Sequence, residues 1–262
     1  MPINKHNRNI VILLSIGFTA GILGGLLGIG GGAFIVPALV FFLAFEQHRA
    51  HGTSLAVVLA LSLTSVIIYS CHGCVDIGVA CEIAIGGILG ALLGGSIVQM
   101  IKSKALRRMF SVFLLAAGAK MIYDGLATGA SGSTEFIRVA FTLHNMMLGI
   151  GTGIVTGFLS SLLGVGGGIV MVPMLTMLLA FPQKQAQGIS LAAMMPIAFT
   201  GMLKHNKLGN VDFVVAQWVA LGAVAGAFVG SIFATGLPSH HLKLAFGIFI
   251  AVMALLMAAK KK

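Results

Sequence analysis

The chain has 262 residues, of which 58% are hydrophobic and only 8% are charged, and its formal net charge is +10. Soluble domains carry about 25% charged residues, so this composition excludes an ordinary water-soluble fold. The excess of Lys and Arg does not indicate a nucleic-acid partner, because these residues stand at the ends of apolar stretches and at the termini, where they orient membrane helices.

Apolar stretches long enough to cross a bilayer recur along the chain, which predicts an all-α polytopic membrane protein. Lys5, Arg8 and the apolar run after them resemble a signal peptide, but no small-residue cleavage site follows, so we expect a retained first span. The expected membrane helices lie near 9–29, 52–70, 77–101, 105–123, 139–163, 188–203, 211–236 and 242–259. Two shorter apolar pieces, 33–45 and 169–181, follow glycine-rich runs and are too short to span comfortably.

The second half of the sequence aligns with the first without gaps when Gly164 is placed on Gly28. In this repeat alignment, glycines and a proline of "GGLLGIGGGAFIVP" (24–37) coincide with those of "SSLLGVGGGIVMVP" (160–173), and "GCVD" (73–76) coincides with "GNVD" (209–212). Coincident Gly, Pro and Asp indicate a duplicated membrane unit rather than chance apolar matches. We therefore expect a first membrane repeat over 1–125, a connecting loop over 126–137 and a second repeat over 138–262.

The distribution of basic residues predicts how the repeats are oriented. If 9–29 and 33–45 form a bent, re-entrant hairpin, the second repeat is inverted and most of the 16 Lys and Arg residues fall on one face. Treating 9–45 as one broken crossing divides them almost evenly. The positive-inside rule therefore favours two inverted repeats, each with a glycine-broken half-helix hairpin plus transmembrane helices, and it places both termini in the cytoplasm.

Two interpretations compete for the clustered glycines. Scattered glycines spaced by four, Gly86, Gly90, Gly94, Gly222 and Gly226, are typical of a closely packed helix face. The clusters followed by Pro37 or Pro173 instead predict an unwound segment and a new helix whose first turn contains the proline. Its free N–H groups would face the break, and two such breaks should meet as an anion site made of backbone.

The expected substrate-binding residues surround these breaks and the matching polar positions downstream. Ser and Thr there are either helix N-caps or hydroxyl donors to an anion. His51 and Gln187 occupy matching positions, either as further donors or as loop residues. The full set is Gly30, Gly31, Gly32, Ala33, His51, Thr53, Ser54, Gly166, Gly167, Gly168, Ile169, Gln187 and Ser190.

Three carboxylates are candidates for ion coupling. Asp76 and Asp212 each precede a span, where N-capping is the alternative role, and Glu82 lies one turn into its span, where an ionisable group is a functional candidate. The "CHGC" stretch from Cys71 to Cys74 is a redox pair, a metal site, a sulfur-handling feature or neutral variation. Its few adjacent ligands do not make a standard zinc site, so we expect no metal.

The doubled GxGGG–x4–P unit, followed by Ser-Leu-Ala and Val-Asp, resembles the TauE/SafE family of sulfite-exporter-like transporters over residues 21–115 and 157–251. The resemblance implies a secondary transporter, more specifically an exporter, of a small sulfur-containing anion such as sulfite or an organosulfonate, in a bacterial plasma (inner) membrane. It implies alternating access about a midplane site, membrane lipid as surroundings and a proton or sodium ion as coupling ion. Assembly as a homo-oligomer is left open.

We expect no enzyme activity, no catalytic residue, no cofactor and no nucleic-acid partner. Two alternative functions remain at this point. The first is a passive anion channel, and the second is a membrane thiol oxidoreductase that uses Cys71 and Cys74.

Overall fold

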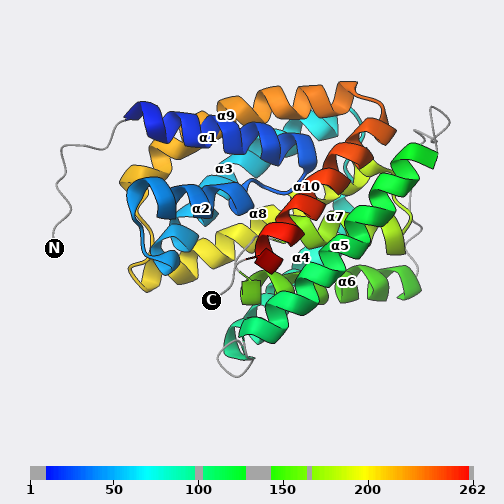
Figure 1. Cartoon of the computed structure of the whole chain (residues 1–262), viewed down its shortest axis with the longest axis horizontal. Helices are drawn as coiled ribbons and strands as arrows, with labels where there is room; N and C mark the ends of the chain where they lie inside the picture. The colour runs from blue at the N-terminus through cyan, green and yellow to red at the C-terminus, as the bar shows by residue number, and fades with distance from the viewer. Residues whose placement is uncertain (1–9, 98–102, 128–142, 164–166, 260–262) are drawn as a thin grey trace.

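The structure is a computed structural model, and it describes residues 10–97, 103–127, 143–163 and 167–259. This part of the chain is helical throughout, without a strand (Figure 1). The helices are α1 (Ile10–Leu27), α2 (Gly32–Leu43), α3 (Gln47–Cys71), α4 (Ile77–Ile97), α5 (Ser103–Ala127), α6 (Leu143–Leu163), α7 (Gly168–Leu178), α8 (Gln183–Lys207), α9 (Phe213–Gly236) and α10 (Ser239–Ala259).

Five of the described helices, α1, α3, α8, α9 and α10, are long and apolar enough to cross a membrane, while α2, α7 and apolar segments of α4 and α6 are shorter. Large apolar side chains on their outer surfaces remain exposed, such as Phe41 (80%), Phe42 (70%) and Leu221 (58%). So many exposed apolar side chains are suited to the hydrocarbon core of a membrane rather than to water. The all-α polytopic fold is thus confirmed.

Two of the expected helix starts are wrong. Helices α3 and α8 begin at Gln47 and Gln183, whereas the spans were expected from residues 52 and 188. In both places the chain leaves a short helix through an alanine with positive φ, Ala44 (51°) or Ala180 (53°). The polar residues that follow already belong to the next helix. In α8, several of them are buried, including Gln183, Gln185 and Gln187.

Helices of one half pack chiefly on helices of the other. Figure 1 shows α1 beside α9 and α5 beside α10, and α4 packs on α6 in the same manner as α1 packs on α9. The repeat alignment converts the pair of α1 and α9 into the pair of α6 and α4. The packing of helices between the two halves is therefore reciprocal.

Small residues allow these crosswise pairs to approach closely, as expected from the sequence. Gly86 and Gly90 of α4 face backbone carbonyls of α6, and Gly222 and Gly226 of α9 face backbone carbonyls of α1. The packing interpretation is confirmed for these four glycines, and the surroundings of Gly94 lie outside the described part of the structure. A side chain at any of the four would push the helices apart.

Two buried apolar clusters form the interior. One joins α1, α2, α3, α8 and α9 through residues such as Val219, and it also includes Leu242 of α10. The other joins α4, α5, α7, α8 and α10 through residues such as Ile83, and it also includes Leu27 of α1 and Ala33 of α2. Each cluster contains helices of both halves, so neither half folds around a core of its own.

Candidate functional site

The first glycine run breaks the helix where the sequence predicts a break. Gly28, Gly30 and Gly31 have φ of 71°, 70° and 68°, the left-handed region that glycine enters without a steric penalty. The Gly31 carbonyl accepts hydrogen bonds from the N–H groups of Phe34 and Ile35, at 3.0 Å each. The N–H groups before Phe34 therefore have no carbonyl partner within α2.

The second run repeats the hydrogen bonds that start the helix, although Gly167 has φ of −63° where Gly31 has φ of 68°. Residues 164–166, which include Gly166, lie outside the described residues. Helix α7 begins at Gly168, and the Gly167 carbonyl accepts from the N–H groups of Val170 and Met171 at 3.1 and 2.9 Å. These bonds coincide with those at Gly31 in the repeat alignment.

The expected position of the prolines is wrong. Pro37 and Pro173 lie at the sixth residue of α2 and α7, beyond the first turn in which proline needs no N–H partner. The glycine backbone therefore starts these helices, and each proline removes one hydrogen bond inside its helix. Such losses are tolerated in membrane helices where neighbouring groups satisfy the freed carbonyl.

The first break touches the second half directly. The backbone of Gly168 packs on Ile29, and the Ser190 hydroxyl donates to the Gly28 carbonyl at 2.9 Å. Ser190 is fully buried at this junction. Segments of the two different repeats thus form one contact at the centre of the fold.

A cavity lies beside this junction. Its empty space, including the open mouth, is about 490 Å³. The lining residues come from both halves of the chain and are Gly32, His51, Ser54, Leu55, Val58, Gly157, Gly167, Met171, Met194, Ile197 and Ala198.

Four of the expected binding residues, Gly32, His51, Ser54 and Gly167, line this cavity. The others that the structure describes lie behind its wall or in the packed interior. Gly30 packs against Met194, Gly168 against Ile29, and Ala33 and Ile169 are buried in the apolar clusters. The second wall of the cavity, with Met171, Met194 and Ile197, was not expected, and apolar residues on an apolar helix carry no signal that would reveal it.

The expected hydroxyl groups are not helix caps, since Thr53, Ser54 and Ser190 all lie inside α3 or α8. The Ser54 hydroxyl donates to the His51 carbonyl at 2.9 Å, one turn back. A hydroxyl bonded in this way keeps its lone pairs but shares its only proton. It becomes a donor to another group only by rotating away from that carbonyl.

Gln187 and Tyr69 form a fully buried polar pair between α8 and α3. The Tyr69 hydroxyl lies 3.0 Å from the Gly25 carbonyl and 3.1 Å from Gln187 Oε1. Gln187 also packs against Gly28, so the pair supports the first glycine break from behind.

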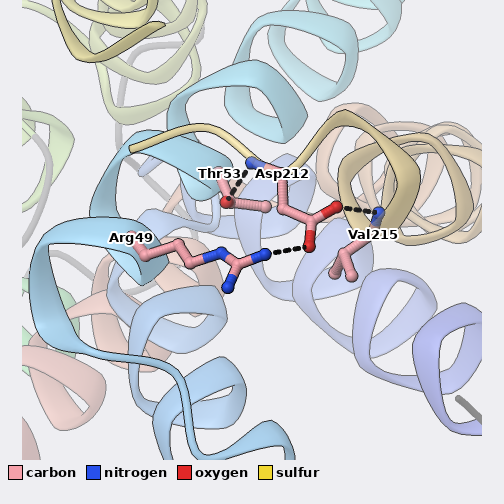
Figure 2. Close-up of polar contacts among 4 residues, drawn as sticks. All are labelled: Arg49, Thr53, Asp212 and Val215. Carbon is pink, nitrogen blue, oxygen red and sulfur yellow. Dashed lines mark hydrogen bonds and ion pairs between the residues drawn. The ribbon is translucent and has the colours of Figure 1, made fainter. Parts of the chain in front are cut away.

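An ion pair between the halves was not expected from the sequence. Figure 2 shows Arg49 of α3 bound to Asp212, with its Nη2 atom 2.8 Å from Oδ2. Asp212 Oδ1 accepts from the Val215 N–H, and the Asp212 N–H donates to the Thr53 hydroxyl, at 3.1 Å each. The N-cap interpretation of Asp212 is confirmed. The one signal in the sequence was the charge at Arg49, because the matching position in the second half holds the neutral Gln185.

The other two candidate carboxylates have simpler surroundings. Asp76 Oδ1 accepts from the Val79 N–H at 3.2 Å, so Asp76 also caps a helix, α4. Glu82 lies on α4 against Gly149 of α6, at a partly exposed position.

The cysteines of the "CHGC" stretch are free thiols. Cys71 is exposed, and Cys74 is half-buried with its Sγ 3.4 Å from the His72 carbonyl. Burial raises the pKa of the Cys74 thiol, although Lys184 acts in the opposite direction. A raised pKa leaves less of the thiolate that thiol–disulfide chemistry requires, which disfavours the oxidoreductase alternative.

Helices long and apolar enough to cross a membrane, with a cavity lined from both halves of the chain, are typical of membrane transporters. The model of the family described as "Sulfite exporter TauE/SafE" matches residues 2–121 and 149–262. The chain therefore belongs to the TauE/SafE family of membrane transporters.

Several curated proteins are similar along most of their length. A probable membrane transporter protein, YunE, of Bacillus subtilis is 29% identical over 85% of this chain and 88% of its own length. A probable membrane transporter of Xylella fastidiosa (strain 9a5c) is 28% identical over 95% of this chain and 94% of its own. MJ0441 of Methanocaldococcus jannaschii, also a probable membrane transporter, is 28% identical over 94% of both. No solved structure matches the chain.

Proposed function

We propose that this transporter exports a small sulfur-containing anion, such as sulfite or an organosulfonate, through the cavity between the halves. The observation that carries the proposal is the lining of the cavity. It combines the starts of α2 and α7, at Gly32 and Gly167, with the imidazole of His51 and the hydroxyl of Ser54. Helix starts and neutral donors bind anions without burying a fixed positive charge.

The lining of the cavity supports a small anion with an apolar portion. Apolar residues, including Leu55, Val58 and Met171, supply most of the lining and polar groups are few. An anion held there loses most of its water, so it needs the aligned N–H groups at the helix starts to compensate. Two of the expected contacts behind the wall, Gln187 and Ser190, would act by holding the glycine break before α2 in place, while Thr53 holds Asp212 at the start of α9.

The orientation is part of the proposal. Two repeats, 1–125 and 138–262, joined by 126–137, would be inverted about an axis in the membrane plane, with both termini in the cytoplasm of a bacterial cell. The reciprocal packing of α1 on α9 and α4 on α6 supports such an axis. Helix α2 has 12 residues, about 18 Å, and would enter a bilayer core of about 30 Å without crossing it.

Alternating access would then move two mixed bundles rather than the two repeats. One apolar cluster takes most of its members from α1, α2, α3 and α9, and the other takes most of its members from α4, α5, α7 and α10. Helix α8 contributes to both, and Leu27 of α1, Ala33 of α2 and Leu242 of α10 lie where the two groups meet. Tight glycine contacts join α1 to α9 across the repeats. Each bundle would therefore move as a body that contains helices of both repeats.

The test is transport by purified protein in liposomes. We expect saturable flux of sulfite or a sulfonate, whereas a passive channel would not saturate at millimolar concentration. Removing the cavity hydroxyl with Ser54→Ala should raise KM severalfold, because a neutral hydrogen bond contributes about 1 kcal/mol. Ser62→Ala is the matched control, since Ser62 is buried in the same helix but does not line the cavity. Absence of flux for every sulfur oxyanion and sulfonate would refute the proposal.

A further inference from the structure

Two histidines from opposite halves of the chain lie side by side, and one of them lines the cavity. His51 of α3 and His205 of α8 lie edge to face, with ring centroids 6.0 Å apart and ring planes inclined by 67°. Within the described residues, the Nδ1 atoms of both rings are buried and have no hydrogen-bond partner. His51 also lines the cavity. The pair therefore offers unused proton acceptors next to the proposed anion site.

The two matching positions in the repeat alignment hold a pair of residues that bond to each other. In the repeat alignment, Gln187 stands where the first half has His51, and Tyr69 stands where the second half has His205. Tyr69 and Gln187 are joined by a hydrogen bond and are fully buried. An amide and a phenol do not exchange protons near neutral pH, whereas imidazoles do. Only one of the two related places can bind and release a proton.

Among the described residues, the charged groups that act on the pair from nearby are basic. His48 and Lys204 act on the pair as nearby basic groups. The carboxylate of Asp212 is bound to Arg49, and Glu46 is exposed at the start of α3.

The other helices add little charge near the pair. Helices α1, α2, α7 and α9, which pack on α3 or α8, contain no Asp, Glu, His, Lys or Arg. Glu82 of α4 lies against Gly149 of α6, and α10 has His240, His241 and Lys243 in its first turns. A proton on the pair therefore lacks a protein counter-ion among these groups, and an anion in the cavity would supply one.

We propose that His51 and His205 form the proton-binding site of this carrier and that one proton crosses with each anion. This inference rests on the proposed function. The proton leaves a water molecule or hydronium ion on one side and forms an N–H bond on an imidazole of the pair. After the cavity opens to the other side, the anion departs and the N–H bond breaks, returning the proton to water.

The linkage is reciprocal. Anion binding raises the affinity of the pair for a proton by the same factor by which the proton raises the affinity for the anion. A doubly negative anion that carries one proton still moves one negative charge, so an inside-negative potential continues to favour its export. A singly negative sulfonate would cross with its proton as a neutral pair and would leave down its own concentration gradient. Asp76 and Asp212 are less suited to this role because each already caps a helix.

The test measures the steady-state accumulation of anion in liposomes that hold the protein. With the voltage clamped to zero by potassium and valinomycin, a difference of one pH unit should concentrate the anion about tenfold on the alkaline side for one proton per anion. This ratio reports coupling independently of the transport rate. His51→Gln and His205→Tyr, the residues of the related pair, should bring it close to one. The control is His241→Gln, because His241 does not line the cavity, and this variant should keep an accumulation ratio near ten.

A second measurement does not require transport. Addition of a sulfonate, which stays fully ionised near neutral pH, to detergent-purified protein in weak buffer should take up protons from solution, and both variants should lose this uptake while eluting as folded protein. If the wild type transports anion without accumulation, or if the variants keep the tenfold ratio or the uptake, the proton site is refuted and the transporter stands. If the wild type transports no anion, the proposed function fails and the proton site fails with it.

Discussion

Asp212 joins three parts of the fold through one side chain and one N–H group. It caps α9 at Val215, binds Arg49 of α3 and is fixed by the Thr53 hydroxyl (Figure 2). Its side chain is only 7% exposed, whereas that of Arg49 is 41% exposed. A buried carboxylate needs partners that compensate its charge. Arg49 therefore stabilises the fold more than its partly exposed position suggests.

We expect Arg49→Gln to lower the free energy of unfolding by about 1–2 kcal/mol, because the carboxylate loses a charge-assisted hydrogen bond that solvent only partly replaces. The thermal midpoint of the detergent-purified protein should fall by about 2–6 °C. Lys120→Gln is the control, because Lys120 and Asp124 form an exposed pair within one helix. Its loss should shift the midpoint by less than about 1 °C. Equal shifts would show that the Arg49–Asp212 pair has no special role.

Cys74 provides a test by pH. Since burial raises the pKa of its thiol, the reactive thiolate should form only at more alkaline pH than in a free cysteine. In a Cys71→Ser, Cys81→Ser protein, alkylation of Cys74 by iodoacetamide should be slower than alkylation of free cysteine at pH 8. The rate should continue to rise above the pH at which free cysteine levels off. Alkylation as fast as that of free cysteine, with the same pH profile, would contradict the burial of this thiol.

At the scale of elements, the order of the helices could be predicted because apolar length and the internal repeat are strong signals. The glycine break at residues 28–31 was predictable for the same reason, since clustered glycines within a membrane helix leave few alternatives. The starts of α3 and α8 were not, because residues such as Gln183 and Gln187 are polar in sequence and buried in the fold. Their burial depends on contacts between the halves that no local pattern encodes.

Alanine substitutions at two glycines can distinguish the stability cost of lost packing space from the cost of backbone strain at the break. Gly28 and Gly209 both have φ of 71°, but only Gly28 faces a neighbour, with Gln187 Cβ 2.6 Å from where an alanine Cβ would lie. Gly209→Ala should cost about 1 kcal/mol from strain alone. Gly28→Ala should cost a further 1–3 kcal/mol, roughly, because α8 must move. Thermal unfolding of both variants measures the difference, and equal costs would mean that the break is loosely packed.

At the scale of the whole molecule, the exchange of helices between repeats determines which parts can move together. Helices α1 and α9 belong to different repeats but share one apolar cluster and close backbone contacts. Helix α4 belongs to the other cluster. The account therefore predicts that distances within a cluster stay fixed during transport and that distances across the cavity change.

Spin labels on exposed, lipid-facing positions can measure this. In a cysteine-free background, labels at Val11 of α1 and Phe228 of α9 should keep one distance with and without sulfite. Labels at Val11 and Leu89 of α4 should change their distance distribution. If the first pair changes and the second does not, the moving bodies are not the two clusters.

The most direct test of the central claim is a structure of the protein in a lipid nanodisc with a transported sulfur anion bound. We predict density for the anion in the cavity, in contact with both halves of the chain near Gly32 and Gly167 and within reach of Ser54 and His51. Density for the anion elsewhere in the molecule, or in contact with one half alone, would contradict a site formed by the two glycine breaks.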